Sequence, residues 1–237
     1  MNIIGIIPAR FNSTRLPGKP LEDINGVSMV MRVVYQARKA GLSEVIVATD
    51  NDRIFEHVIN HGAKAVMTSP LHPSGTDRCL EAALQCKTMP DAVINIQGDE
   101  PFIEPEVINK LALLLRTRDI QICTLIKEFD SDESLQNPNR VKVIIDDAGK
   151  ALSFSRKAGD ASQKQFQHLG IYGYSMQALK EITQLEQSPL ELKEKLEQLR
   201  WFENGYDIYT AQVQENSVCV DTPEDLETAR ALAKKID

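Results

Sequence analysis

Strand-like and helix-like segments alternate along the first half of the chain. Apolar runs of strand length occupy residues 3–7, 44–49, 65–68 and 92–96. Segments with apolar residues at helical spacing occupy residues 27–40, 52–61, 77–86 and 104–116. This alternation predicts a parallel sheet covered by helices on both faces, with right-handed crossovers. We therefore expect an α/β fold with a ligand site at the carboxyl ends of the strands.

The pattern changes after Ile120. Strand-like segments follow without long helices between them, at residues 120–126, 140–145, 151–155 and 169–174. Asp146-Asp147-Ala148-Gly149-Lys150 has the composition of a hairpin turn. A helix is expected at 189–200, a strand at 207–212, and a final helix capped by Thr222 with Pro223 in its first turn. We expect one domain over residues 1–237, with an inserted mixed-β lobe at about 120–212 that is suited to dimerisation.

Composition excludes several classes of function. The chain has 237 residues, and 42% apolar with 26% charged residues is ordinary for a globular protein. A net charge of −7 argues against general binding of nucleic acid or of anionic membranes. No signal peptide is recognised, and the opening apolar run is too short to span a bilayer, so we expect no membrane partner and a cytoplasmic protein. The four cysteines form no C-x-x-C pair, which argues against structural zinc or a disulfide framework.

A basic loop follows the first predicted strand. Arg10, Arg15 and Lys19 stand within ten residues, among small residues and a glycine. Such a loop at the carboxyl edge of a sheet is typical of a polyphosphate site, although a solvated turn is the alternative. The spacing matches neither the Walker P-loop nor the three-glycine dinucleotide fingerprint. A hydride-transferring enzyme is therefore disfavoured.

Two aspartates follow short apolar runs. Asp99 lies in a Gly-Asp turn after the strand at 92–96, and Asp221 follows Val218-Cys219-Val220. Each has a structural alternative, as a turn aspartate or as the neighbour of a helix cap. Magnesium in nucleotide sites is held by one or two carboxylates together with phosphates. The pair therefore indicates a Mg²⁺-nucleotide site if the two residues meet in space.

A second group of polar residues lies in the later half. Strand alternation places His168, Tyr172 and Tyr174 on one face, which suits a hydroxyl-rich ligand and equally a solvated sheet face. Glu197 and Gln198 read as the solvated face of a helix, and Arg156 as an exposed cation unless an acidic ligand lies nearby.

Together these segments resemble the 3-deoxy-manno-octulosonate (Kdo) cytidylyltransferases, the CMP-Kdo synthetases. The similarity runs nearly from end to end. It is carried by Pro8–Pro20, Ser74–Arg78, Asn95–Pro101, Phe154–Arg156, His168–Tyr174, Leu196–Arg200 and Val220–Leu226.

The resemblance implies a Rossmann-like nucleotidyltransferase fold of the nucleotide-diphospho-sugar transferase type. It implies a homodimer that converts CTP and Kdo to CMP-Kdo and pyrophosphate for lipopolysaccharide synthesis. By motif position it implies four catalytic residues, Lys19, Arg15, Asp99 and Asp221, with Asp99 and Asp221 as Mg²⁺ ligands. The nucleotide-binding residues it implies are Arg10, Ser13, Arg15, Lys19, Ser74, Gly75, Arg78 and Asp99. The sugar-binding residues it implies are Gln97, Arg156, His168, Tyr172, Glu197 and Gln198, with Arg156 as the candidate for the sugar carboxylate.

The chain departs from this pattern after Arg156, where the segment 157–164 is shorter than is usual and lacks an isoleucine-proline pair. Other sugar acids, such as an acylneuraminate or an amino variant of Kdo, therefore stay open as acceptors. A nucleotidyltransferase acting on a sugar phosphate would need a further cation cluster, which is not evident. A catalytically dead nucleotide-binding or scaffold protein is a further alternative, but Lys19, Asp99 and Asp221 are all present.

Overall fold

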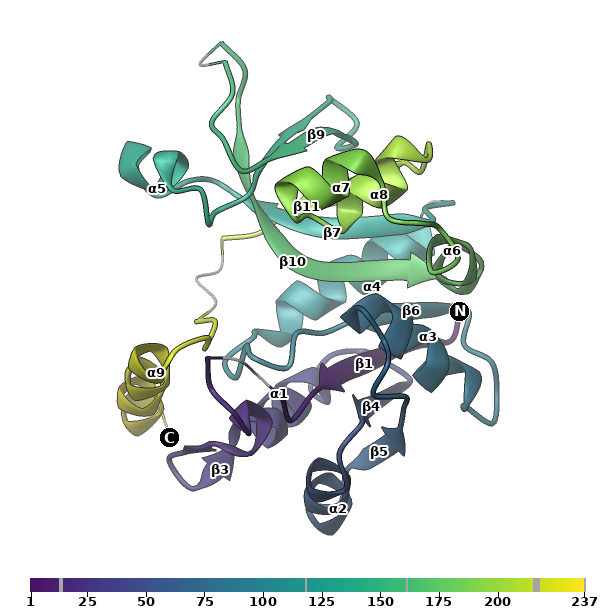
Figure 1. Cartoon of the computed structure of the whole chain (residues 1–237), viewed down its shortest axis with the longest axis vertical. Coiled ribbons are helices and arrows are strands. Elements are labelled where there is room, and N and C mark those ends of the chain that lie inside the picture. The colour runs from purple at the N-terminus through teal and green to yellow at the C-terminus, as the bar shows by residue number, and fades with distance from the viewer. Residues whose placement is uncertain (13–14, 118, 161, 215–217, 237) are drawn as a thin grey trace.

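The computed structural model of the chain describes residues 1–12, 15–117, 119–160, 162–214 and 218–236. It confirms the alternation of strands and helices in the first half (Figure 1). The strands are β1 (Ile3–Ala9), β4 (Glu44–Thr49), β5 (Lys64–Met67) and β6 (Ala92–Asn95). The helices are α1 (Met29–Ala37), α2 (Asp52–Asn60), α3 (Gly75–Leu84) and α4 (Pro105–Thr117).

The central sheet is mixed and mostly parallel, as the sequence predicted. It is completed by β7 (Ile122–Lys127), β10 (Phe166–Ser175) and β11 (Ile208–Gln212), in the order β11-β7-β10-β6-β1-β4-β5. β10 runs antiparallel to both of its neighbours, whereas the other pairs along this path are parallel. The carboxyl ends of β1, β4 and β6 therefore share one edge, where the basic loop and Asp99 emerge.

Two apolar layers hold helices against the sheet. One face packs β1 residues Ile3 and Ile7 with residues of α1 and α4, such as Val34 and Leu111. On the other face Ile6 packs in a cluster that contains residues of α3, α6 (Met176–Ile182) and α8 (Gln198–Glu203). Alternate residues of β1 thus enter opposite cores, which is why its sequence is apolar on both faces.

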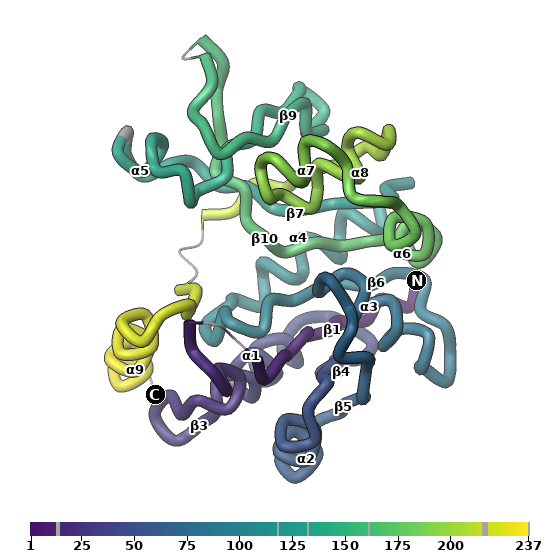
Figure 2. The backbone as a smooth tube through the Cα atoms, viewed as in Figure 1, coloured from purple at the N-terminus to yellow at the C-terminus, as the bar shows by residue number. Residues whose placement is uncertain are grey.

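The C-terminal helix packs against a hairpin from the N-terminal part of the chain. The hairpin of β2 (Asp23–Ile24) and β3 (Val27–Ser28) packs against α9 (Pro223–Ile236), as the tube view shows (Figure 2). Ile24 and Leu226 are buried in one small cluster there. This packing fixes the segment before α9, which carries Asp221, beside the basic loop.

The region at 120–212 divides between the sheet and a smaller projection. Its strands β7, β10 and β11 belong to the central sheet, while β8 (Lys142–Ile145) and β9 (Ala151–Ser155) form a hairpin attached to β10. The predicted turn between them is present, with Gly149 at φ +80° and its N–H donated to the Asp146 carbonyl at 3.0 Å. Dimerisation through this region stays a prediction.

Some element bounds differ from expectation. The helix expected at 189–200 is two helices, α7 (Pro189–Glu194) and α8, because Lys195 adopts a left-handed conformation at φ 55°. The helix expected from Val27 begins at Met29, since residues 27–28 pair in the β2–β3 hairpin. The 3₁₀ turn η1 (Lys19–Leu21), α5 (Asp132–Gln136) and α6 were not predicted. Among the described residues no helix is both long and apolar enough to cross a membrane.

Candidate active site

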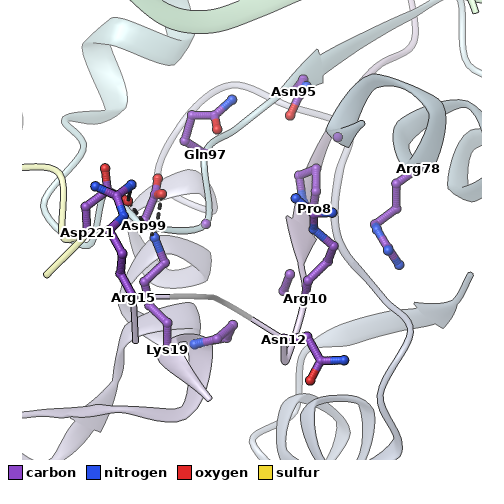
Figure 3. A pocket seen from close by; sticks show the side chains of 14 residues that line it. Pro8, Arg10, Asn12, Arg15, Lys19, Arg78, Asn95, Gln97, Asp99 and Asp221 are labelled. Atoms are coloured by element: carbon purple, nitrogen blue, oxygen red, sulfur yellow. Dashed lines mark hydrogen bonds and ion pairs between the residues drawn. The ribbon is translucent and has the colours of Figure 1, made fainter. Parts of the chain in front are cut away.

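A cavity of about 390 Å³ opens at the carboxyl ends of β1 and β6. Its walls come from the basic loop, the first turn of α3, the turn after β6, and Asp221. Figure 3 shows Lys19 and Arg15 facing Asp99 and Asp221, with Arg10 and Arg78 across the cavity. The cavity therefore has cations on both sides and a pair of carboxylates at one end.

The loop that carries the cations is closed by its own backbone. Gly18 has φ +74°, a conformation that favours glycine, and its N–H donates to the Phe11 carbonyl at 2.9 Å. Lys19 follows at once, in the 3₁₀ turn, with its side chain turned into the cavity. Ser13, predicted from the resemblance as a phosphate ligand, lies outside the described residues.

Lys19 joins the two aspartates. Its Nζ lies 2.8 Å from Asp99 Oδ2 and 3.2 Å from Asp221 Oδ1, and it donates to the Val220 carbonyl at 3.0 Å. Burial acts to lower the pKa of Lys19, but the charges and hydrogen bonds of both carboxylates outweigh it and raise the pKa. Arg15 Nη2 lies 3.1 Å from Asp221 Oδ1 as well. The predicted catalytic residues are thus linked in one chain of contacts, in which Lys19 contacts both aspartates and Arg15 contacts Asp221.

Backbone contacts hold the two carboxylates in place. The Val220 N–H donates to the Asp99 carbonyl at 2.9 Å, which ties the segment before α9 to the turn after β6. The Asp225 carboxylate accepts from the N–H groups of Asp221 at 3.0 Å and Thr222 at 2.9 Å. Thr222 Oγ1 accepts in return from the Asp225 N–H at 3.2 Å, which confirms the predicted helix cap. Asp221 therefore lies directly before a capped helix start, and its own N–H takes part in the cap.

The aspartate pair has the chemistry of a divalent-cation site. Single ligand atoms of Asp99, Cys219 and Asp221 all lie within 4.8 Å of one another. Carboxylate oxygens suit Mg²⁺, and both carboxylates already converge on a cationic Nζ. The sequence did not single out Cys219 here, because a lone cysteine before Val-Asp has no metal-ligand spacing.

Gly98 allows the turn after β6 to approach the end of β1 closely. A Cβ on this residue would lie 2.8 Å from the Pro8 carbonyl oxygen, which belongs to the backbone and has little freedom to move. Glycine therefore lets the turn that carries Asp99 lie directly on the end of β1. Pro8 and Asn95, which begin two of the resembling segments but were not predicted as site residues, line the same cavity. Asn95 stands two residues before Gln97, so strand alternation could have indicated it.

The three residues expected around the cytidine have different environments. Gly75, the first residue of α3, lines the cavity. Arg78 also reaches the cavity, but its side chain is 1% exposed and its Nη2 lies 2.8 Å from Asp50 Oδ2. Ser74 caps α3 by accepting from the N–H groups of Thr76 and Asp77, and it is not among the residues that line the cavity.

Most of the predicted sugar residues lie near each other, beside the cavity. Gln97 lines it and donates from Nε2 to the Gly170 carbonyl at 2.9 Å. Tyr172 pairs with Asn95 across the β10–β6 ladder, and Thr76 of α3 donates to Glu197 Oε2 at 3.1 Å. Burial raises the pKa of Glu197, while hydrogen bonds from Ser74 and Thr76 oppose that rise.

This neighbourhood contains buried polar atoms without a hydrogen-bond partner. Among the described residues they include Asn95 Oδ1, Tyr172 Oη, Gln198 Nε2 and Trp201 Nε1. The Tyr172 and Trp201 rings are in edge contact, with centroids 5.1 Å apart. Orphaned polar atoms in such a site are costly, and a bound ligand or water can satisfy them.

His168 stands at the edge of this group. Its ring centroid lies 5.3 Å from that of Tyr172, and its Nε2 lies 3.0 Å from Thr124 Oγ1. Burial lowers the pKa of His168 to about 3, so the ring is neutral near neutral pH. The ladder of β10 with β7 shifts register between Leu169 and Tyr172. The rings of His168, Tyr172 and Tyr174 nevertheless lie next to one another, which confirms that they share one face.

Arg156 is not brought into the cavity. Its Nε donates to the Glu194 carbonyl at 2.7 Å, and its Nη groups donate to the Pro138 and Lys195 carbonyls at 3.3 Å and 3.2 Å. The guanidinium thus ties the strand end of β9 to the α7–α8 connection. In this structure Arg156 thus contacts the backbone of the lobe, and its role toward the sugar carboxylate stays a prediction.

A mostly parallel sheet whose carboxyl edge joins a cationic loop to paired carboxylates suits the transfer of a nucleotidyl group. The cytidylyltransferase family model matches residues 4–208, and the chain belongs to this family. A putative glucose-1-phosphate thymidylyltransferase from Bacillus anthracis shares the fold, with a TM-score of 0.71 at 16% identity over 99% of this chain and 96% of that one.

More similar proteins narrow the class. The chain is 48% identical to 3-deoxy-manno-octulosonate cytidylyltransferase from Cytophaga hutchinsonii over 95% of each chain. It is also 48% identical to that of Parabacteroides distasonis over 98% of each. The solved structure of a CMP:2-keto-3-deoxy-manno-octonic acid synthetase complexed with CTP has a TM-score of 0.94, with 38% identity and full coverage of both chains. Within the cytidylyltransferases, the chain belongs with the 3-deoxy-manno-octulosonate enzymes.

Proposed function

We propose that this chain transfers the cytidylyl group of CTP to Kdo, forming CMP-Kdo and pyrophosphate. The observation that carries the proposal is the cluster of Lys19, Asp99 and Asp221 in a cavity lined by further cations. Membership of the family supports CTP as the donor and Kdo as the acceptor. The enzyme would thereby supply the activated sugar for lipopolysaccharide synthesis.

The cations of the basic loop are proposed to hold the triphosphate. Arg10, Arg15 and Lys19 line one continuous cavity, and Ser13 belongs to the same loop in sequence. Gly75 lies at the N-terminal end of α3, where backbone N–H groups favour a polar ligand, and we place it with Ser74 and Arg78 around the cytidine. Arg15 and Lys19 would stabilise the charge that develops on the leaving pyrophosphate.

Asp99 and Asp221 are proposed to hold Mg²⁺. When bound, the ion would polarise the α-phosphoryl group and lower the pKa of the sugar hydroxyl. Lys19 now contacts both carboxylates, so its ammonium would leave them and turn to the phosphates of the incoming nucleotide. The two aspartates would orient the α-phosphorus for in-line attack by the anomeric hydroxyl.

The acceptor is proposed to lie against Gln97, Tyr172, Glu197 and Gln198, with His168 at one side. The unpartnered polar atoms of Tyr172 and Gln198 support this placement, because sugar hydroxyls can both donate and accept hydrogen bonds. Arg156 stays the candidate for the sugar carboxylate by family resemblance. Because it donates to the Glu194 and Lys195 carbonyls in this structure, the cations of the cavity are a second candidate.

Family resemblance also supports a homodimer formed through the lobe at about 120–212, within one nucleotidyltransferase domain. We further infer a cytoplasmic protein without nucleic-acid or membrane partners, in keeping with the net charge of −7. Light scattering on the purified protein would measure the assembly: twice the 26.5 kDa chain mass is expected, and the chain mass alone would contradict the dimer.

The function is tested by pyrophosphate release from CTP, UTP and ATP with a panel of sugar acids. We expect release only with CTP, only when Kdo is present, and none after EDTA. Asp99→Asn is the matched inactive control. Release with an acylneuraminate or an amino-substituted acid in place of Kdo would move the acceptor assignment and keep the donor site. No release with any acceptor, while CTP still binds, would favour a nucleotide-binding protein without catalysis.

A further inference from the structure

A second cavity, of about 380 Å³, adjoins the first. Asp99 lines the first cavity and the next residue, Glu100, lines the second. In the same way, Asp221 lines the first cavity and Cys219 lines the second. In addition, Gln97 of the first cavity donates to the Gly170 carbonyl of the second at 2.9 Å. The two cavities therefore meet beside the aspartate pair.

The second cavity has charged walls of both signs. Lys127, at the end of β7, is 9% exposed, and its Nζ lies 3.4 Å from Asp130 Oδ2. Arg140 is 38% exposed, and its Nη1 lies 3.7 Å from the same oxygen. Glu100 adds a second carboxylate, so these four residues carry no net charge. A lining that mixes donors and acceptors in this way fits a neutral, hydroxyl-bearing chain better than a second anion.

Arg140 is well placed to bind such a chain. Its Nη1 donates to Gln167 Oε1 at 3.0 Å, which orients both side chains on the cavity wall. Its Nε and Nη2 have no hydrogen-bond partner among the described residues, so donors are available for a ligand. The Gln167 amide nitrogen is likewise available, since its Oε1 is the atom bonded to Arg140.

The chemistry of a 2-ulosonic acid decides which part of it can reach this cavity. The anomeric carbon carries both the attacking hydroxyl and the carboxylate, so both must stay beside the α-phosphate in the first cavity. The hydroxylated two-carbon side chain of an eight-carbon acid is carried by C6, which the ring oxygen separates from the anomeric carbon, and its bond to the ring points outward. It can therefore extend away from the aspartate pair, past Gln97 and Glu100.

We propose that the second cavity binds the hydroxylated side chain of the acceptor, with Arg140 and Gln167 as its donors. This inference rests on the proposed function and adds a determinant of selectivity to it. The site would favour sugar acids that carry the side chain over shorter acids with the same anomeric group. Arg140 and Gln167 would act on acceptor binding and not on CTP.

The test varies the substrate and the protein together. Kdo is compared with a six-carbon 3-deoxy-2-ulosonic acid, whose pyranose ring has no side chain. In the unaltered enzyme kcat/KM should be about tenfold or more higher for Kdo, mainly through KM, because charge-assisted hydrogen bonds are lost with the shorter acid. Arg140→Leu should lower kcat/KM for Kdo about tenfold, without changing it for the shorter acid or changing the KM for CTP.

Two further variants make the result specific. Gln167→Leu should also lower the selectivity for Kdo over the six-carbon acid. Agreement between the two variants would show that the loss does not come from a folding defect in one of them. Arg116→Leu is the control, because that guanidinium donates to the Gly41 carbonyl, at the far end of α4 from the cavity. It should leave both acids unaffected.

The outcomes separate the two proposals. Equal kcat/KM for both acids in the unaltered enzyme would overturn the side-chain subsite and leave cytidylyl transfer intact. An equal fall for both acids in Arg140→Leu and Gln167→Leu would also overturn it. Failure of the unaltered enzyme to release pyrophosphate with either acid would overturn the proposed function, and the subsite with it.

Discussion

Lys19 occupies the position between Asp99 and Asp221 that a divalent cation would share. Replacing it with methionine keeps an apolar chain of similar length and removes the charge. We therefore predict that Lys19→Met binds Mn²⁺, a stand-in for Mg²⁺, more tightly than the unaltered protein when no nucleotide is present. The same variant should use CTP poorly, because the charge that meets the phosphates is gone.

The magnitude follows from the exposure of the groups. The Lys19 and Asp99 side chains are 14% and 25% exposed, so their contact is that of a partly buried charge-assisted bond, about 1.5–3 kcal/mol. Asp221 is 39% exposed, and solvent screening leaves its contact with Lys19 near the value of a surface pair, under about 1 kcal/mol. A total near 2 kcal/mol corresponds to a roughly 30-fold gain in Mn²⁺ affinity.

Electron paramagnetic resonance of free Mn²⁺ measures this affinity without any turnover. Arg10→Met is the matched control: Arg10 lines the same cavity, and the described structure shows no ion pair between it and either aspartate. Arg10→Met should change the Mn²⁺ affinity much less than Lys19→Met does. Equal or weaker Mn²⁺ binding by Lys19→Met would refute the competition between ammonium and metal. So would a gain of the same size in Arg10→Met.

Three other predictions concern the site and its support. Asp99→Asn should lower kcat by orders of magnitude with an unchanged circular dichroism spectrum, and normal turnover at equal Mg²⁺ would remove Asp99 from the metal site. Gly98→Ala should lower the free energy of unfolding in urea by about 1–3 kcal/mol, since its Cβ would lie 2.8 Å from the Pro8 carbonyl oxygen. Gly75→Ala, with its nearest neighbour at 3.6 Å, is the control, and equal effects would contradict the steric argument. Burial lowers the pKa of His168 to about 3. Below pH ~6.5 the His168 imidazole is therefore protonated in the unfolded chain but stays neutral in the native protein. Stability should then fall by up to about 1.4 kcal/mol per pH unit between pH ~6.5 and ~4, and a slope unchanged in His168→Gln would assign it to other groups.

Local pattern predicted the elements that carry their own signals. The strands at 44–49 and 151–155 have the predicted bounds, because short strand-like segments bordered by polar turns need no distant partner to be recognised. The break at Lys195 was missed, since neither glycine nor proline marks it. The convergence of Lys19 with Asp99, 80 residues away, followed from the rule that parallel strands share one carboxyl edge.

The contacts made by the lobe could not be predicted from local sequence pattern or from the shared edge of parallel strands. Whether Arg156 faced a ligand or the backbone depended on the α7–α8 connection, whose path is set by tertiary packing. The second cavity arises likewise from Lys127 on β7, Arg140 in the loop before β8 and Gln167 on β10, which form no motif. Sequence reasoning could therefore predict that Lys19 meets the two aspartates, but not which residues the lobe brings to the second cavity.

The central claim is that a sugar hydroxyl displaces pyrophosphate from CTP in this cavity. Phosphorus NMR of a single reaction with CTP, Kdo and Mg²⁺ tests it most directly. We expect the three CTP signals to be replaced by equal amounts of a cytidine monophosphate diester and pyrophosphate, and no change in the presence of EDTA. Persistence of CTP, or its conversion to CDP and phosphate, would contradict the account.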